Sequence, residues 1–136
     1  MRICIDSNQF ILGISGANPS SDKLLTLLPQ FEVVLPRLVL QEVSRNLSRA
    51  QIKSFYALLQ RARVTVVEES VPADWVNKYV SLGLREKADA FIGAFVEWQG
   101  IAFLVSSNRQ FLAELKTGAF EVLRPDEFLL RYHREP

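Results

Sequence analysis

Four polar residues interrupt or directly follow segments of the chain that are otherwise apolar. Asp6 closes the short apolar segment 2–5, and Ser7, Asn8 and the start of an apolar helix come directly after it. A carboxylate in this position stands where open α/β sheets keep their ligands, at the carboxyl end of a strand. The other three interruptions are Glu42, Asp89 and Asn108. Together they predict one acidic site assembled from the whole chain.

Few other residues in the chain could carry catalysis. The single cysteine, Cys4, lies in the first apolar segment with no histidine near it in sequence, so we expect a buried apolar residue and not a nucleophile. The single histidine, His133, lies in the polar C-terminal tail and is expected at the surface. One cysteine and one histidine are too few for a disulfide framework, a multi-cysteine metal site or a histidine-ligated zinc site, and the histidine has no partners nearby for a Ser-His-Asp triad. Carboxylate chemistry remains.

Some of these polar residues also have simpler structural explanations. The side chain of Asp6 could cap the helix that follows, and Ser7 or Asn8 could do the same. Glu42 could be a solvated helix residue paired with Arg45, three positions later. Both alternatives remain open from the sequence alone.

The other two residues differ in how easily they are explained. Asn108 could be the N-cap of a helix over 109–115. Asp89 is hardest to explain structurally, because Ala88, Ala90, Phe91 and Ile92 surround it and a buried, unpaired carboxylate is costly. Asp89 is therefore the strongest single indication of a functional site.

The segments around these residues alternate between strand and helix patterns. Short runs of β-branched and aromatic residues predict strands at 2–6, 31–35, 63–67, 102–105 and 120–123. Helical patterns begin at 9 and cover 23–28, 37–48, 49–62, 73–82 and 86–99, with N-caps expected at 20–22 and Ser48 and helix starts at Pro36 and Pro72. The Gly-, Asn-, Pro- and Ser-rich segment 13–21 is expected to be a loop.

Strands that alternate with helices imply right-handed βαβ crossovers and a mostly parallel central sheet covered on both faces, a three-layer α/β/α fold. The 136 residues fit one domain, 1–136, and 49% hydrophobic with 23% charged residues is ordinary for a globular protein. The net charge of +1 neither requires nor excludes a polyanionic partner. We expect no signal peptide, no membrane span and a cytoplasmic location.

The chain resembles the PIN domain family. The resemblance is carried by Asp6-Ser7-Asn8 after the first strand, the Pro36-to-Glu42 helix start, the Asp89 helix, and the segment 104–111 with its Ser106-Ser107-Asn108. These segments occur in the family's order and spacing over nearly the whole chain. The resemblance implies a metal-dependent ribonuclease similar to the VapC-like toxins of toxin–antitoxin pairs.

The resemblance also implies roles for single residues. Asp6, Glu42 and Asp89 match the acidic positions that hold Mg²⁺ or Mn²⁺, and Ser106 matches the family's hydroxyl position. The fourth site position is Asn108, where many relatives carry aspartate. An asparagine can coordinate through its carbonyl oxygen but removes one negative charge. This departure leaves open whether one or two ions bind and whether the site is active.

Further residues are expected to support the site or its substrate. Glu86 lies three residues before Asp89, on the same helical face, although an acid in the first turn of a helix is also favourable in itself. A phosphate backbone could follow the basic residues near the site, although a solvated helix face would explain them equally well. These candidates for RNA binding are Arg45, Arg49, Lys53 and Arg109, with Arg37, Arg85 and Lys87 also near the site in sequence.

Two other functions compete with the nuclease. The first is a non-catalytic PIN-like module that binds RNA or protein, which the asparagine at 108 favours. The second is a receiver-like phosphoacceptor domain, but this reading expects an acidic pair after the first strand and a lysine after a late one. Here Asp6 has no acidic neighbour, and Ser106-Ser107-Asn108 follows the late strand.

The sequence also predicts how the protein assembles. Trp75, Val76, Tyr79 and Val80 are taken as exposed apolar residues, and together with the family's habit of dimerising they predict a homodimer. An antitoxin is expected to place an apolar helix in a groove near the active site, with a basic side chain reaching the carboxylates. The segment 13–21 is expected to border the substrate cleft.

Overall fold

The central strand of the sheet is β1 (Arg2–Ile5), which lies between β2 and β4. Ile3, Cys4 and Ile5 are completely buried, because helices cover both faces of this strand. An uninterrupted apolar run is typical of a parallel strand buried on both sides. The prediction that Cys4 is buried is confirmed, and burial raises the pKa of its thiol. The computed structural model describes residues 1–132, so His133 lies outside the described residues.

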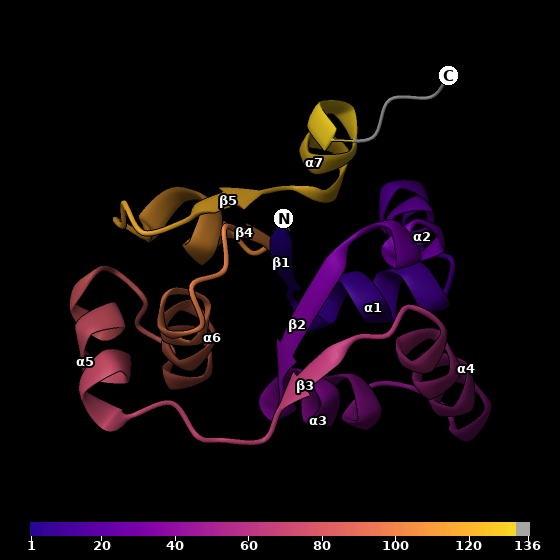
Figure 1. Ribbon diagram of the computed structural model, residues 1–136, viewed down its shortest axis with the longest axis horizontal. Helices are drawn as coiled ribbons and strands as arrows, with labels where there is room; N and C mark the ends of the chain where they lie inside the picture. The colour runs from indigo at the N-terminus through magenta and orange to yellow at the C-terminus, as the bar shows by residue number, and fades with distance from the viewer. Residues whose placement is uncertain (133–136) are drawn as a thin grey trace.

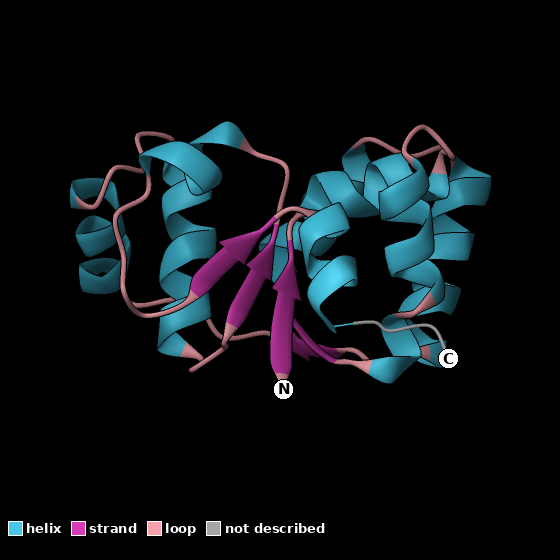
Figure 2. Ribbon diagram, turned by 90° about the horizontal axis from the view of Figure 1, so that it is seen from above, coloured by secondary structure: helices cyan, strands magenta, loops and turns pink. Residues whose placement is uncertain are grey.

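The sheet has five parallel strands in the order β3-β2-β1-β4-β5. The other four strands are β2 (Glu32–Pro36), β3 (Thr65–Val67), β4 (Phe103–Val105) and β5 (Glu121–Leu123). All five lie where the sequence predicts strands, and the α/β fold with a parallel sheet is confirmed. Figure 2 shows the strands between two groups of helices.

The helices are α1 (Ser7–Ile14), α2 (Pro19–Thr26), α3 (Arg37–Arg45), α4 (Arg49–Arg61), α5 (Ala73–Ser81), α6 (Lys87–Trp98) and α7 (Pro125–Tyr132), with short helical turns η1 (Leu28–Gln30) and η2 (Gln110–Glu114). Helices α5 and α6 pack together on one side of the sheet, and α1, α2 and α4 lie on the other (Figure 1). Within the described chain, no helix is long and apolar enough to cross a membrane.

Helices α5 and α6 approach each other closely at Gly93. A Cβ atom there would lie 2.8 Å from Leu84 and 2.9 Å from Tyr79, so a larger residue would push α5 away. Gly100, with φ of 65°, takes the left-handed conformation just after the end of α6.

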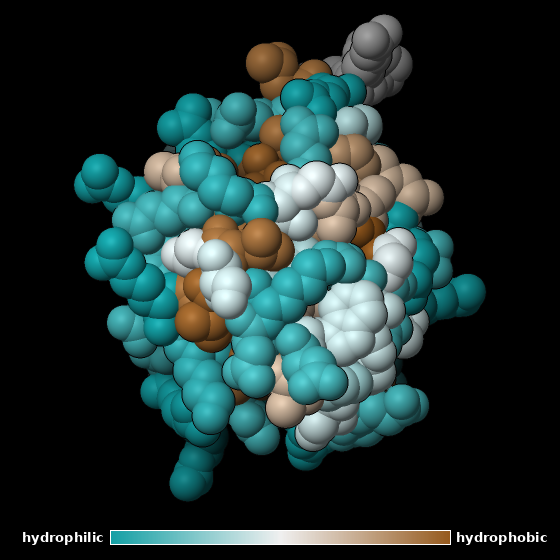
Figure 3. All heavy atoms as spheres, turned by 90° about the vertical axis from the view of Figure 1, so that its left-hand side faces the viewer, coloured by the Kyte–Doolittle hydropathy of each residue, from teal (hydrophilic) through white to brown (hydrophobic). Residues whose placement is uncertain are grey.

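The expectation of an exposed apolar face on α5 is wrong. Tyr79 is completely buried and Val76 is 8% exposed, because both pack against α6. Trp75 is half-buried, and Val80 is the exposed member of the set. The side of the molecule that carries α5 is mainly hydrophilic, with hydrophobic atoms in separate small areas (Figure 3). The residues of α5 therefore do not support the prediction of a homodimer.

Two helix predictions also need correction. Helix α2 begins at Pro19, not Lys23, and its N-cap is Asn18, whose side chain accepts a hydrogen bond from the Ser21 N–H. Most of the predicted loop 13–21 is therefore helical. Helix α7, which carries the buried Phe128 and packs on α2, was not predicted. The N-cap at Ser48 is confirmed as a full capping box with Gln51.

Candidate active site

The candidate site lies at the carboxyl ends of β1 and β4. The chain builds β1, β2 and β3 outward in one direction and then returns to place β4 on the opposite side of β1. The junction between β1 and β4 is therefore the point where the strand order reverses, the usual ligand position in open α/β sheets. Asp6 follows β1 and Ser106 follows β4, directly across this junction.

Asp6 is held in place by hydrogen bonds to both carboxylate oxygens. Its Oδ2 accepts from the Ser106 hydroxyl at 2.9 Å, and its Oδ1 accepts from the Ser7 N–H at 2.8 Å. The Asp6 side chain thus does cap α1, and it does so while facing the site. Ser106 Oγ in turn accepts from the Asn108 N–H at 3.0 Å. The carboxylate is 4% exposed and fixed in orientation.

Glu42 on α3 and Asp89 on α6 bring two more carboxylates to the same place. The structure brings together all four predicted site residues in a polar cavity of about 230 Å³. The cavity is lined by Asp6, Ser7, Asn8, Ile11, Glu42, Arg45, Asn46, Asp89 and Asn108. Residues from four separate parts of the chain therefore share one site.

The three carboxylates disfavour each other's ionisation. Burial raises the pKa of Asp6, and hydrogen bonds from Ser106 and Ser7 oppose this. Burial and the charge of Asp6 raise the pKa of both Glu42 and Asp89. A site with this pattern favours proton uptake or a bound cation, either of which relieves the repulsion.

Asn108 partly relieves the repulsion in the protein itself. Its side-chain Nδ2 donates to Asp89 Oδ1 at 3.4 Å, and its Oδ1 accepts from the Gln110 N–H at 2.9 Å. The second bond is the capping role that the sequence left open. The first lowers the pKa of Asp89, the opposite of what an aspartate at position 108 would do.

The residues fit a hard divalent cation that keeps part of its water shell. Glu42 Oε1 is buried and accepts no hydrogen bond from the protein, so its lone pairs are available to a metal ion. Among residues 1–132, no group of three His, Cys, Asp or Glu side chains is already arranged to hold a metal ion. Mg²⁺ takes only one or two carboxylates directly and keeps several waters, which suits this arrangement.

The supporting acid Glu86 does not line the cavity. It is exposed immediately before α6, and its charge is close enough to raise the pKa of Asp89. Asn8, in contrast, is exposed and lines the cavity, and Ser7 donates through both its N–H and its hydroxyl to Asp6. The alternative ion pair between Glu42 and Arg45 does not occur among the described residues, although the charge of Arg45 lowers the pKa of Glu42.

The predicted basic stripe is not continuous. Arg45 ends α3, the chain turns at 46–48, and Arg49 and Lys53 lie on α4. Of the candidates for RNA binding, Arg45 lines the cavity, whereas Arg49, Lys53 and Arg109 are exposed outside it. Because a break between two helices separates Arg45 from Arg49, the three residues do not form one helical repeat.

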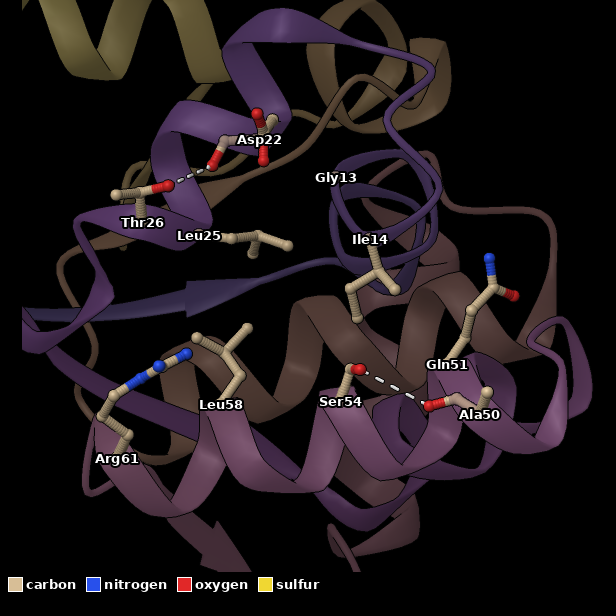
Figure 4. Close-up of a pocket in the computed structure, with 10 residues that line it drawn as sticks. All are labelled: Gly13, Ile14, Asp22, Leu25, Thr26, Ala50, Gln51, Ser54, Leu58 and Arg61. Atoms are coloured by element: carbon tan, nitrogen blue, oxygen red, sulfur yellow. Dashed lines mark hydrogen bonds between the residues drawn. The ribbon is translucent and has the colours of Figure 1, made fainter.

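The segment 13–21 does not border the acidic cavity. Helix α1 starts at the site and runs away from it, so Gly13 and Ile14 instead line a separate cavity of about 380 Å³ between α1, α2 and α4 (Figure 4). Hydroxyls on its walls, from Thr26 and Ser54, donate to backbone carbonyls of their own helices. This second cavity shares no lining residue with the candidate site.

Sequence reasoning missed a buried glutamine behind the site. Gln9 is completely buried; its Nε2 donates to Ser107 Oγ at 2.9 Å and its Oε1 accepts from Ser21 Oγ at 2.7 Å. These bonds tie α1 and α2 to the segment that follows β4. Gln9 is a polar residue before an apolar run, the same signal that identified Asp6 and Asp89. Asn46, also missed, lines the cavity and donates to the Glu42 carbonyl.

Comparison with solved structures gives the same fold. The chain is similar to VapBC2 of Rickettsia felis bound to a DNA fragment from its promoter, with 17% identity, a TM-score of 0.64, and coverage of 91% of this chain and 98% of that one. It is similar to PAE2754 of Pyrobaculum aerophilum (19% identity, TM-score 0.61, coverage 96% and 94%). It is also similar to FitAcB of Neisseria gonorrhoeae (18% identity, TM-score 0.56, coverage 90% and 97%).

At these identities the structural likeness shows the fold alone, and no curated protein matches the chain in sequence. The PIN domain family model provides the stronger result, because it matches residues 3–117, which include Asp6, Glu42, Asp89 and Asn108. The chain belongs to the PIN domain family.

Proposed function

We propose that the protein is a metal-dependent endoribonuclease and the toxin of a toxin–antitoxin pair, acting in the cytoplasm. The observation that carries the proposal is the convergence of Asp6, Glu42 and Asp89 on one polar cavity at the reversal point of a PIN-domain sheet. The buried Glu42 oxygen without a partner supports the same proposal, because a cation would give it one.

The residues have separate tasks in this mechanism. Asp6, fixed by Ser106 and Ser7, provides a carboxylate that does not need to be ordered when the ion and substrate bind. Glu42 and Asp89 complete the negative charge around it. A bound Mg²⁺ or Mn²⁺ supplies an activated water and a place for the charge that develops on the phosphate oxygens. Arg45, at the rim, can attract the phosphate backbone.

Charge-neutralising variants test this proposal. Asp6→Asn and Asp89→Asn should abolish cleavage of single-stranded RNA while circular dichroism stays unchanged, because a neutral amide of equal size binds a hard cation weakly. Asp74→Asn is the matched control, since Asp74 is exposed on α5, away from the cavity. Full cleavage by Asp6→Asn and Asp89→Asn, or no cleavage by the wild type with Mg²⁺ or Mn²⁺, would contradict the proposal.

Asn108 favours a second candidate, a non-catalytic PIN module that binds RNA or protein. Its amide donates to Asp89 and keeps the fourth position neutral, which weakens cation binding. In that case the wild type would bind RNA without cleaving it, with and without Mn²⁺, and Asp89→Asn would bind RNA as well as the wild type or better.

An antitoxin is the expected protein partner. Two of the similar structures, VapBC2 and FitAcB, support this extension to the present chain. We propose that the antitoxin covers the acidic cavity and presents a basic side chain to its carboxylates. Co-expression with a neighbouring small open reading frame should yield a complex that does not cleave RNA. Recovery of the toxin alone, with full activity, would argue against this partner.

We also propose a homodimer, on the resemblance to the family. Light scattering at micromolar concentration should then give twice the chain mass of 15.5 kDa. A species of only the chain mass would exclude the dimer at that concentration.

A further inference from the structure

Residues of α3 and α4 line a further cavity of about 300 Å³, which shares only Arg45 with the acidic site. Its lining consists of Arg37, Leu40, Gln41, Ser44, Arg45 and Tyr56. It therefore combines two arginines, two neutral hydrogen-bonding side chains, a leucine and an aromatic ring. No carboxylate belongs to this lining.

Tyr56 is the exposed aromatic residue of this cavity. It is 47% exposed, although large apolar side chains are usually covered. Its ring contacts that of Phe55 at 5.4 Å, and Phe55, completely buried, packs edge-on against Phe10. The exposed ring is thus supported from below by the core, so little conformational freedom would be lost when another planar group stacks on it.

Arg45 joins this cavity to the acidic site. It lines both, and its charge lowers the pKa of Glu42. Arg37 also lines the α3–α4 cavity, but its guanidinium is paired with Glu68 at 2.9 Å. Arg45 is therefore the cation placed to contact a chain that leaves the acidic site toward Tyr56.

The charge of the lining separates this cavity from the larger ones. In the cavity of about 450 Å³ between α3 and α6, Glu68 and Glu69 balance Arg37 and Lys87. In the one in Figure 4, Asp22 balances Arg61. Neither lining has the net positive charge that attracts a phosphate backbone. The α3–α4 cavity has the combination that unpaired nucleotides need, an aromatic face for the base and a guanidinium for the phosphate.

We propose that the α3–α4 cavity binds an unpaired nucleotide of the RNA next to the scissile phosphate. The base stacks on Tyr56, the phosphate contacts Arg45, and Gln41 and Ser44 provide hydrogen bonds to the base edge. The inference rests on the proposed nuclease function and adds a requirement to it: the base next to the cleavage position must reach Tyr56. A base-paired strand could not turn its base onto the tyrosine.

The inference can be tested by measuring how a short fluorescent single-stranded RNA binds, using fluorescence anisotropy. All variants carry Asp89→Asn as well, so that the RNA stays intact. Tyr56→Ala should weaken binding about tenfold, since the loss of one stacked base has an effect of this size. Tyr56→Phe, which keeps the ring, should bind within about twofold of the parent. Arg45→Gln should flatten the dependence of log affinity on log salt by about 0.7, the loss of one single-strand phosphate contact.

A second arm places the base directly. RNA that carries 5-iodouridine beside the cleavage position should cross-link to the peptide containing Tyr56. The matched control is Leu130→Ala, which removes an 85% exposed apolar side chain from α7 and should leave affinity unchanged.

Equal affinity of Tyr56→Ala and its parent, or cross-links only to other peptides, overturns this inference and leaves the nuclease proposal intact. A Tyr56→Ala variant that binds RNA normally but loses a co-expressed antitoxin overturns it in favour of a protein-docking surface. A wild-type protein that neither binds nor cleaves RNA overturns both proposals.

Discussion

The hydrogen bond between Ser106 and Asp6 should make a pH-dependent contribution to stability. Ser106→Ala removes a 2.9 Å bond to a buried carboxylate, and bonds to charged groups contribute about 1.5–3 kcal/mol. It also takes away the acceptor of the Asn108 N–H, for about 1 kcal/mol more. We expect the free energy of unfolding at pH 7 to fall by about 2–4 kcal/mol.

The sign of the pH dependence follows from Asp6. Its pKa in the folded protein is raised by burial, and Ser106 opposes that rise, so the variant has a still higher Asp6 pKa. The variant therefore loses more stability than the wild type as the pH rises from about 4 to 7. As the pH falls toward 4, protonation removes the charge that Ser106 stabilises, and the difference between the two proteins should shrink.

Urea unfolding at pH 4 and pH 7, without divalent ions, measures both quantities. Ser54→Ala is the control, because Ser54 is exposed and bonds only to a carbonyl of its own helix; it should change stability by less than about 0.5 kcal/mol. The Mn²⁺-induced rise in Tm should also be smaller for Ser106→Ala, since Asp6 then keeps only its bonds from Ser7 and is less firmly oriented. A loss at pH 7 no larger than that of Ser54→Ala, or equal losses at both pH values, would refute the reasoning.

Three further predictions concern the same cavity and its support. Asp89→Asn should raise the free energy of unfolding at pH 7 by less than about 1 kcal/mol and leave it unchanged at pH 4, because a half-buried carboxylate with a raised pKa destabilises the protein as the pH rises and an amide does not. Urea unfolding in EDTA measures this, and a lower stability at pH 7 would contradict it. Asn108→Asp should lower Tm in EDTA but increase the rise in Tm with Mn²⁺ and keep or raise RNA cleavage, because it replaces a hydrogen-bond donor to Asp89 with a fourth negative charge. If calorimetry shows that Mn²⁺ raises the Tm of the variant no more than that of the wild type, position 108 has no ligand role. Gly93→Ala should destabilise the protein by about 1–3 kcal/mol, since the new methyl group meets Tyr79 and Leu84; unchanged urea unfolding would show that α5 moves away without cost.

The strands, and the four residues that meet in the acidic cavity, were predictable because each leaves a local signal in the sequence. The five apolar runs correspond to the five strands, and Asp6, Glu42, Asp89 and Asn108 stand out as polar residues in apolar surroundings. Segment 13–21 was misread because Pro19 and Ser20 are typical of loops as well as of a first helical turn, where Asn18 caps them.

Burial on α5 was not predictable from α5 itself. Tyr79 and Val76 are buried only because α6 presents Gly93 and comes close, a tertiary fact that a single amphipathic segment does not reveal. Helix α7 did carry its signals, with Pro125 at its start and two acids in the first turn, but the alternation of strands and helices gave no reason to look beyond β5. The break at 46–48 separates Arg45 from Arg49, and the capping box of Ser48 and Gln51 starts a new helix there.

The bond between Asp6 and Ser106 joins residues 100 positions apart. Until β4 has been synthesised and paired with β1, Asp6 lacks its bond from the Ser106 hydroxyl, and Asp89 has no Asn108 beside it. A chain that stopped before β4 could not complete the proposed site, although it would already contain Asp6, Glu42 and Asp89. The proposed activity therefore depends on late-synthesised residues, and a truncated product would lack it.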